Sequence, residues 1–451
     1  MAMGHKQPAP PPVESLPQGQ GQPFYQHLEA FLTAHDFDGF VEDKCRKFYA
    51  KKRGRPSHPP GLYFRALLMG YFEGLGSERA IAWRIQDSMS LRAWLGFSPA
   101  QKVPVHSTLS HTRQRISLPA HRDVFRWVLA RLGEEGLLCG RTLGIDASTI
   151  QANASLKTLV RREGGQNYQQ FLDGLLQAAG VKHPTAEDRR RLDRTRKKKL
   201  SNKEWKSPHD PHARILKLKD GRTRLGYKDE QTVDLDTGAV VAVVTHLGDR
   251  GDPQSLKKTM EESDENLVSI RDGPAAQDRT SHIEEWVGDK GYHCNAVLVE
   301  CERRKVRSYF SEPSRGRRTW HGQSAAKQAV YANRRRIRGP RGKRLLRKRG
   351  ELLERPFRHR LDLGGLRRVF VRGLCNVQKR SHLCASAQNL GLLMRHRHGI
   401  GTPRCLQDRR AFWMAHPLRG EPQVPAPAPL LAQRTAPRQR APTQLHLRFA
   451  A

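Results

Sequence analysis

The N-terminal part of the chain carries apolar residues at helical spacing, interrupted by short glycine and proline segments. Between Leu62 and Glu73 the apolar positions form a wide stripe, and Gly74-Leu-Gly76 ends it. Ser77 is placed to cap the next helix. The pattern predicts a helical domain over residues 26–138, with helices at 62–73, 77–86, 91–95, 104–116 and 123–137.

The helix predicted at 104–116 has an outer face of Ser, Thr, His and Arg side chains. We expect Arg113 and Arg115 to be exposed on it. Short helices joined by glycine turns, one of them polar outside, are typical of helix-turn-helix-like DNA-binding units. A helical bundle that merely packs on the next domain explains the pattern about equally well.

After Arg141 the pattern changes to short apolar runs that predict strands. A hairpin turn signal, Asp236-Thr-Gly238, separates two of them. A long polar insertion over about 156–222 precedes this hairpin, and helices are expected at 253–265 and 295–304. Strands that alternate with helices after a hairpin predict a mixed α/β domain over 139–400. Its strands are predicted at 141–146, 224–235, 240–247, 283–289 and 306–310.

Basic residues are concentrated in two places. Residues 189–200 hold eight basic residues and one acid, and residues 301–350 hold 18 Lys and Arg and only two acids. The second run leads into a predicted helix at 345–358 that carries Glu351 and Glu354, which favours a substrate channel over a plain solvated face. The segments 1–25 and 401–451 are rich in proline and are expected to be disordered.

The whole chain has 451 residues and a formal net charge of +37. Such self-repulsion implies a polyanionic partner, most simply nucleic acid. No run of residues approaches the length of a spanning helix, and the N-terminus lacks the apolar core of a signal peptide. Seven scattered cysteines without CxxC spacing fit a reducing cytoplasm. We therefore expect a cytoplasmic protein with no membrane partner.

Acids at predicted strand ends are informative in a chain this basic. Asp146 ends one predicted strand, with Ser148 two residues further on the same face, and Asp289 ends another. Carboxylates held together repel one another unless a cation joins them. Mg²⁺ prefers oxygen ligands and is commonly held by one or two carboxylates with substrate phosphate, and two such ions can drive phosphodiester cleavage. For any single Asp, a turn, a cap or a salt bridge is the simpler explanation.

The combination of motifs resembles the DDE transposases of bacterial insertion sequences, in particular the insertion sequence four/five-like group. The resemblance covers roughly residues 25–400, and the segment from Gly54-Arg-Pro56 to Pro104-Val-His-Ser-Thr108 is similar to the helical N-terminal domain of those proteins. It is carried further by residues 144–154, 226–238, Gly288-Asp-Lys-Gly-Tyr292, Glu354-Arg-Pro-Phe357, 364–368 and Arg372-Gly373, with 201–205 and 387–390.

The resemblance implies a ribonuclease-H-like catalytic domain whose acidic triad holds two Mg²⁺ or Mn²⁺ ions. Asp146, Asp289 and Glu354 match the three acids, and Glu351, one turn before Glu354, is the competitor for the third place. Lys290 and Tyr292 match the motif of the second acid and are expected to orient the site or contact phosphate. Asp234, Asp249 and Asp252 also match family positions, although loop and turn roles explain them better.

The favoured hypothesis is a transposase of a bacterial mobile element that cuts DNA at the element's terminal inverted repeats and joins it to target DNA as a homo-oligomer. The alternatives are a non-catalytic basic nucleic-acid-binding protein, such as a decayed transposase, and a metal-dependent nuclease that does not join strands. Residues 315–349 are expected to hold the phosphate backbone. The residues predicted to contact DNA are Arg113, Arg115, Lys290, Tyr292, Arg334, Arg335, Arg336, Arg338, Lys343 and Arg344.

Overall fold

A computed structural model describes residues 21–50, 57–196, 200–218, 220–271, 282–314, 316 and 318–405. The chain divides into two compact units, Met1–Leu406 and Gln407–Ala451. The second unit lies outside the described residues, as does nearly all of the predicted tail over 401–451. The predicted N-terminal segment 1–25 is described only from residue 21, and a helix already begins there at Pro23.

Helices form the N-terminal part of the described chain, and each of the five predicted between 62 and 137 is confirmed with shifted ends. The predicted cap is also present, because the Ser77 hydroxyl accepts a hydrogen bond from the backbone N–H of Ala80 at 3.2 Å. The helices are α1 (Pro23–Ala34), α2 (Phe37–Cys45), α3 (Pro60–Phe72), α4 (Glu78–Asp87), α5 (Met89–Trp94), α6 (His106–Arg115) and α7 (Leu118–Glu134), and the short η2 (Arg46–Phe48) follows α2.

A six-stranded mixed sheet follows, and all five predicted strands belong to it. Strand β1 pairs with β5 in antiparallel and with β7 in parallel orientation, and β8 is parallel to β7. Strands β6 and β4 pair with successive parts of β5. The strands are β1 (Thr142–Gln151), β4 (Arg214–Lys217), β5 (Thr223–Asp234), β6 (Val240–Leu247), β7 (Glu285–Gly288) and β8 (Arg307–Phe310).

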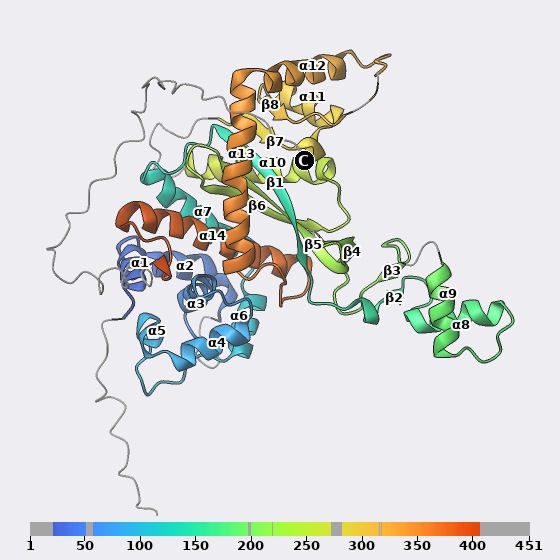
Figure 1. Cartoon of the computed structure of the whole chain (residues 1–451). Coiled ribbons are helices and arrows are strands. Elements are labelled where there is room, and N and C mark those ends of the chain that lie inside the picture. Colours follow the sequence, from blue (N-terminus) through green and yellow to red (C-terminus); the bar gives the residue numbers. More distant parts are fainter. Residues whose placement is uncertain are drawn as a thin grey trace, which may run out of the picture. The chain divides into compact units, whose positions relative to one another are not determined.

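Helices cover both faces of this sheet (Figure 1). Helix α10 (Asp252–Arg271) packs on β5 and β6, while α13 (Pro340–Arg358) crosses β1 and β7 and α14 (Leu374–His398) packs on β6. Helices α11 (Asn295–Arg303) and α12 (Ser324–Arg338) pack beside the edge strand β8. The Asn333 side chain both donates to and accepts from the backbone of Phe310 at 2.9 Å, which fixes α12 against that edge.

The successive side chains of β5 are polar on both faces of the sheet, and both sets are buried. Lys228, Glu230 and Thr232 bond to residues of α10. On the opposite face, Asp229 and Gln231 bond to Arg360 in the π-helical turn η5 (His359–Leu363) that follows α13. The Ser381 hydroxyl of α14 donates to Asp229 at 2.7 Å. Two layers of helices are therefore fixed by the polar side chains of one strand.

The N-terminal helices pack directly on α14, as the bundle interpretation of the sequence expects. Helices α3 and α7 contact it along its length. The Lys379 ammonium donates to the carbonyl oxygens of Arg113 and Ile116 at 2.8 and 2.7 Å, and the Arg380 guanidinium donates to that of Leu75 at 2.9 Å. Buried cations of α14 thus satisfy the carbonyl ends of helices in the N-terminal part.

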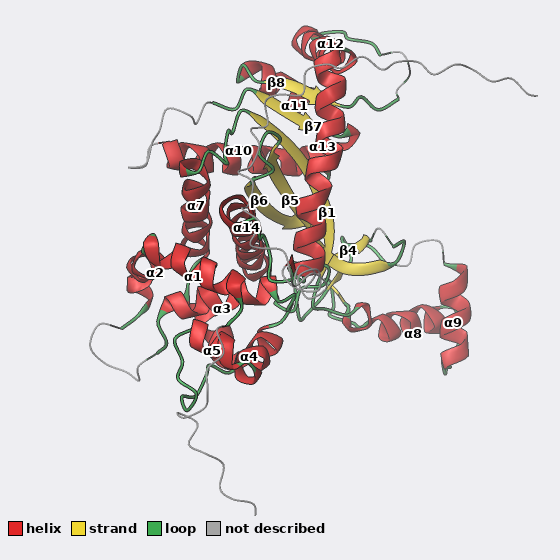
Figure 2. Ribbon diagram, turned by 60° about the vertical axis from the view of Figure 1, so that its left-hand side comes forward, coloured by secondary structure: helices red, strands yellow, loops and turns green. Residues whose placement is uncertain are grey.

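The polar insertion predicted at 156–222 contains a small helical arm, which we define as residues 156–206. Its elements are η3 (Leu156–Thr158), β2 (Val160–Arg161), α8 (Tyr168–Ala178), α9 (Ala186–Thr195) and β3 (Trp205–Lys206). Strands β2 and β3 pair with each other, and α8 packs on α9. Figures 1 and 2 both show this arm apart from the helices that cover the sheet.

We predict that Arg360→Met destabilises the protein by about 3–5 kcal/mol, because it leaves the Asp229 carboxylate buried without its cation. Both side chains are almost fully buried, at 0% and 2% exposure. Arg367→Met is the matched control, because it breaks the exposed Arg367–Asp362 pair, and such pairs contribute about 0–1 kcal/mol. The free energy of unfolding from urea titration measures both effects. Equal losses in the two variants would contradict the central role of the buried pair.

Candidate active site

Asp146 lies on β1, and Asp289 directly follows the neighbouring parallel strand β7. In the pairing of β1 with β7, Gly144 lies opposite Val287, and two further residues along each chain lead to the two aspartates. Asp146 was expected to end its strand. The structure corrects this expectation, because β1 continues to Gln151 and Asp146 lies in mid-strand. Because β7 ends at Gly288, however, β1 has no strand partner on that side at Asp146.

Both carboxylates have partners that leave them accessible. The Asp146 side chain is 30% exposed, and its Oδ2 lies 3.1 Å from Nη2 of Arg349 on α13. Its Oδ1 accepts a hydrogen bond from the backbone N–H of Ala147 at 2.8 Å. The Asp289 Oδ1 accepts from the backbone N–H of Gly291 at 2.9 Å and caps the short helix η4 (Lys290–Tyr292). Asp146 thus has a cationic neighbour, whereas the Asp289 carboxylate accepts its hydrogen bond from the backbone.

A third carboxylate, Asp252 in the first turn of α10, lies beside Asp289. A Cβ atom at Gly291 would stand 2.1 Å from Oδ2 of Asp252 and 3.1 Å from Oδ1 of Asp289. Glycine is therefore required at 291 for the two acids to approach the same backbone. The sequence analysis favoured a loop or turn role for Asp252, and the structure places it in addition beside Asp289.

The other two family-matched aspartates have the structural roles expected of them. Asp234 accepts hydrogen bonds from the backbone of Cys139 and Gly140, and Asp249 forms an ion pair with Arg214 at 3.3 Å. Both hold loops in place.

Tyr292 and Glu230 form a buried layer under the aspartates. The Tyr292 hydroxyl donates to Oε1 of Glu230 at 2.8 Å, and Ser255 donates to the same oxygen at 2.8 Å. Burial raises the pKa of Tyr292 well above its usual value, and the negative charges of Glu230, Asp252 and Asp146 raise it further. The prediction that Tyr292 contacts phosphate is wrong for this structure, because its side chain is 1% exposed. Its contacts instead support the site from below.

The charge of Glu230 itself is maintained by its partners. Burial acts to raise the pKa of the Glu230 carboxyl, but the hydrogen bonds from His246 and Thr259 and the charge of Lys228 outweigh it, so the pKa is lowered. The Lys228 ammonium also binds Oδ1 of Asp252 at 2.6 Å. The acids of the site are thus linked through one buried lysine.

Helix α13 carries Glu351 and Glu354 past this site. Its buried side faces the sheet: a Cβ atom at Gly144 would stand 2.6 Å from Cδ1 of Leu353, so glycine lets the helix approach β1. The Leu353 carbonyl accepts from Gln231 at 3.2 Å. Glu354, the next residue, is exposed, as is Glu351. Among the described residues, no group of three or more His, Cys, Asp or Glu side chains is arranged to hold a metal ion.

The predicted DNA-contacting cations fall into two sets. Arg113 is not exposed as predicted, because it pairs with Glu78 at 2.6 Å. Arg334 and Arg336 are likewise engaged, with Glu312 and with Glu302. Arg113 and Arg336 join helices through these carboxylates, and Arg334 holds the loop after β8 against α12. The remaining cations are exposed at the surface: Arg115, Lys290, Arg335, Arg338, Lys343 and Arg344.

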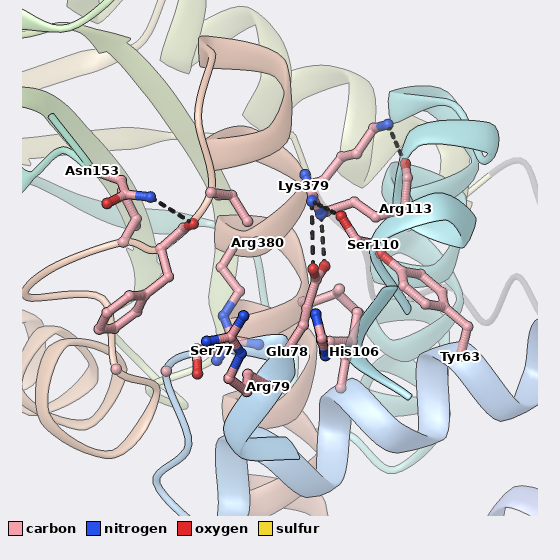
Figure 3. Close-up of a pocket in the computed structure, with 17 residues that line it drawn as sticks. Tyr63, Ser77, Glu78, Arg79, His106, Ser110, Arg113, Asn153, Lys379 and Arg380 are labelled. Carbon is pink, nitrogen blue, oxygen red and sulfur yellow. Dashed lines mark hydrogen bonds and ion pairs between the residues drawn. The ribbon is translucent and has the colours of Figure 1, made fainter. Parts of the chain in front are cut away.

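A cavity of about 440 Å³ lies where the N-terminal helices meet α14 and the segment 365–371 (Figure 3). Its wall carries the exposed Arg79 and His106 and the buried Lys379 and Arg380. Its one acid, Glu78, is already paired with Arg113. Cations therefore outnumber acids on the surface that joins the helical region to the rest of the chain.

Sequence reasoning did not single out Glu230, Lys228 or Arg349. A signal for the first two was present, because Lys228 and Glu230 alternate in a strand whose side facing α10 is polar. Arg349 lies in a run of basic residues, and no local pattern distinguishes it from its neighbours.

In the part of the chain that the structure describes, no helix combines the length and apolar composition needed to cross a membrane. No significant match is found among curated proteins or among solved structures. Residues 14–115, a range that takes in α1 to α6, match a family model described as a transposase domain (DUF772). The helical N-terminal part of this chain is thus similar to a transposase domain, and this similarity supports a transposase.

Proposed function

We propose that this protein is a DNA transposase that binds the terminal inverted repeats of its element and catalyses metal-dependent DNA cleavage and strand transfer. The observation that carries the proposal is that Asp146 on β1 and Asp289 just after β7 each lie two residues beyond the paired Gly144 and Val287, with Asp146 beside the basic helix α13. The match of residues 14–115 to a transposase domain supports the same function independently.

The sheet supports the ribonuclease-H-like part of the proposal. Three antiparallel strands, β1, β5 and β6, are joined to two strands parallel to β1. The long first strand lies between β5 and β7, so an acid in its middle and an acid after β7 come together. An acid from a helix that crosses both strands can then approach them, and α13 contacts both.

The donors of the proposed metal site are carboxylate oxygens, the ligands that Mg²⁺ prefers. Asp146 and Asp289 would provide one ligand oxygen each, with Glu354 as the third acid, and Asp252 beside Asp289 is an additional donor. Bound Mg²⁺ or Mn²⁺ would activate water and stabilise the leaving oxygen. The buried Lys228–Glu230 layer holds Asp252 from below and so fixes the position of this one donor.

The proposed reaction has two phosphoryl-transfer steps. In the first, water attacks a phosphodiester phosphorus, the bond to the 3′-oxygen breaks, and a free 3′-hydroxyl and a 5′-phosphate result. In the second, that 3′-hydroxyl attacks a phosphodiester phosphorus of the target, one new P–O bond forms, the target P–O3′ bond breaks, and the cut target strand leaves with a 3′-hydroxyl. No oxidant or covalent protein intermediate is needed. The role of the protein is to position the strands and to stabilise the charge of the transition state.

The exposed cations support the placement of DNA near α13. Arg335 and Arg338 near the end of α12 and Lys343 and Arg344 at the start of α13 are exposed, and Lys290 is exposed directly after Asp289. In this proposal they hold the phosphate backbone, while the helical N-terminal part recognises the terminal repeats. Pairing of two element ends would require a homo-oligomer, and the expected location is the cytoplasm.

We predict that Asp146→Asn and Asp289→Asn each reduce Mg²⁺-dependent cleavage of element ends by at least about a hundredfold, since each removes a ligand charge. DNA binding should change by less than about threefold. Asp236→Asn, in the turn between β5 and β6, is the control and should cleave normally. Cleavage and joining are measured by incubating cut or uncut element ends with plasmid DNA.

The same assay separates the alternatives. Cleavage without joined products identifies a plain nuclease, and binding without cleavage in the wild type identifies a non-catalytic binder. Glu354→Gln and Glu351→Gln decide the third acid, because only one of them should abolish cleavage. Wild-type rates in the Asp289→Asn variant would refute the proposed site.

We predict that Arg349→Met tightens Mn²⁺ binding about fivefold, because the Arg349 guanidinium neutralises the Asp146 carboxylate and so competes with the ion. Lys348→Met, which removes the neighbouring cation paired with Asp236, should leave the affinity unchanged. Isothermal titration with Mn²⁺ measures both. Weaker binding in Arg349→Met would show that the arginine positions Asp146 instead of competing with the ion.

We predict that the logarithm of DNA affinity falls with the logarithm of salt concentration at a slope of about −5 or steeper, because six or more phosphates are neutralised. Arg344→Ala should make the slope shallower by about 0.9. Arg334→Ala should leave it unchanged, because that guanidinium is engaged with Glu312. Fluorescence anisotropy over a salt series measures the slopes. If the wild type, Arg344→Ala and Arg334→Ala all have the same slope, α13 is not part of the DNA interface.

A further inference from the structure

The arm is a separate basic structure whose charge the proposed active site does not use. Over residues 156–206 it holds 14 Lys and Arg against six Asp and Glu. Its helices α8 and α9 pack on each other and both begin with a capping box, at Asn167 with Gln170 and at Thr185 with Asp188. Such caps stabilise short helices that have little other support. The arm can therefore present a defined surface.

The acids on the inner side of the arm are engaged within it. Asp173 on α8 pairs with Arg189 at 2.6 Å, which joins the two helices. Asp193 accepts a hydrogen bond from the Tyr168 hydroxyl at 2.5 Å. Asp188 accepts from the backbone N–H of Thr185 in the cap. Among the described residues, these three carboxylates form no ion pair with the arginines of the outer face of α9.

That outer face consists of Arg190, Arg191 and Arg194 with one acid, Glu187. All four side chains are exposed, and their spacing of three and four residues places them on one side of the helix. Among the described residues, no carboxylate lies within ion-pair distance of the three arginines. At 1.5 Å per residue, Arg190 and Arg194 are separated by about 6 Å along the axis. This is close to twice the 3.4 Å rise along the duplex axis per phosphate of one DNA strand.

We infer that the outer face of α9 binds the phosphate backbone of duplex DNA at a place separate from the acidic site. A membrane surface suits it poorly, because interfacial helices need an apolar face. The large apolar side chain that the described arm exposes is Leu175, which lies on α8. The inference takes from the proposed function only that the polyanion is DNA.

The arm follows strand β1 in the chain, and the length of this strand beyond Asp146 indicates how far the DNA contact lies from the acidic site. The strand continues for five residues from Asp146 to Gln151, a length of about 17 Å at 3.3 Å per residue, and the arm begins at Leu156. This corresponds to roughly five base pairs of duplex at 3.4 Å each. The arm therefore contacts DNA at least that far from the bond held at Asp146 and Asp289.

The test uses the full chain with Asp289→Asn and no divalent metal, so that cleavage does not enter the measurement. In this background, the triple change Arg190→Gln, Arg191→Gln and Arg194→Gln should make the salt slope of binding to a long duplex shallower by about 2–3. The charge-conserving triple change to Lys should keep the slope. Glu187→Gln, which removes the one acid of this face, should tighten binding.

Duplexes of different length distinguish DNA binding at this surface from DNA binding at the active site. A duplex that extends fewer than about five base pairs beyond the scissile position on the arm side should bind the wild type and the triple Gln variant equally. Equal slopes on the long duplex overturn the inference, and so does an equal loss on short and long duplexes. A loss of binding to phosphatidylserine vesicles, with DNA binding intact, would assign the face to membranes instead. If the wild-type chain neither cleaves nor joins DNA, the proposed function is refuted. The salt slopes still test whether the outer face of α9 binds DNA.

Discussion

The architecture depends on one strand that is polar on both faces and yet lies inside the sheet. A buried polar group without a partner costs about 1–3 kcal/mol, so every such side chain of β5 must be satisfied. Toward α10, the residues Lys228, Glu230 and Thr232 repeat at intervals of two. Their partners on α10, Ser255, Thr259 and Ser263, repeat at intervals of four. Two strand residues span about 6.8 Å and four helical residues about 6 Å, so the helix must run along the strand.

The opposite face of β5 imposes a second constraint, and the candidate site results from both. Arg360 is fully buried and binds Asp229 and Gln231, while Gln231 also binds the carbonyl of Leu353. These contacts fix the end of α13, so Arg349 lies over Asp146 one turn before Leu353. The α10 contacts, in turn, bring Asp252 to Asp289. Two sets of buried hydrogen bonds thus place acids from separate elements around one end of β7.

The strands were predictable because their apolar runs and turn signals are local. Strand β6 lies at residues 240–247 as predicted, and the helices expected on either side of β7 are present. The adjacency of Asp146 and Asp289 follows from parallel pairing, which the alternation of strands and helices indicates. The mid-strand position of Asp146 was not predictable, because polar residues after it suggest an end although β1 continues to Gln151.

Helices α14 and α12 were not predicted from the sequence, for different physical reasons. Helix α14 is buried on almost every side and carries buried polar residues such as Gln378, Lys379 and Asn389, so it shows no amphipathic period. Helix α12 lies in the basic run, where charge obscured its pattern. The prediction that Arg113 is exposed was wrong for a related reason. Its partner Glu78 lies on a different helix, and only the tertiary structure brings the two residues together.

In this basic chain, a carboxylate that is not paired with an arginine is a candidate for another function. In a chain with a net charge of +37, a surface acid has many cations available, and Glu78, Glu312 and Glu302 are each paired with an arginine. Asp289 lies next to Lys290, yet no ion pair joins it to a cation among the described residues, and its oxygen instead accepts from the backbone of Gly291. A backbone bond fixes the orientation of a carboxylate while leaving its charge uncompensated, which favours the binding of an external cation. Asp289 thus lies beside Asp252 without a cationic partner of its own among the described residues, which suits the divalent ion of the proposed site.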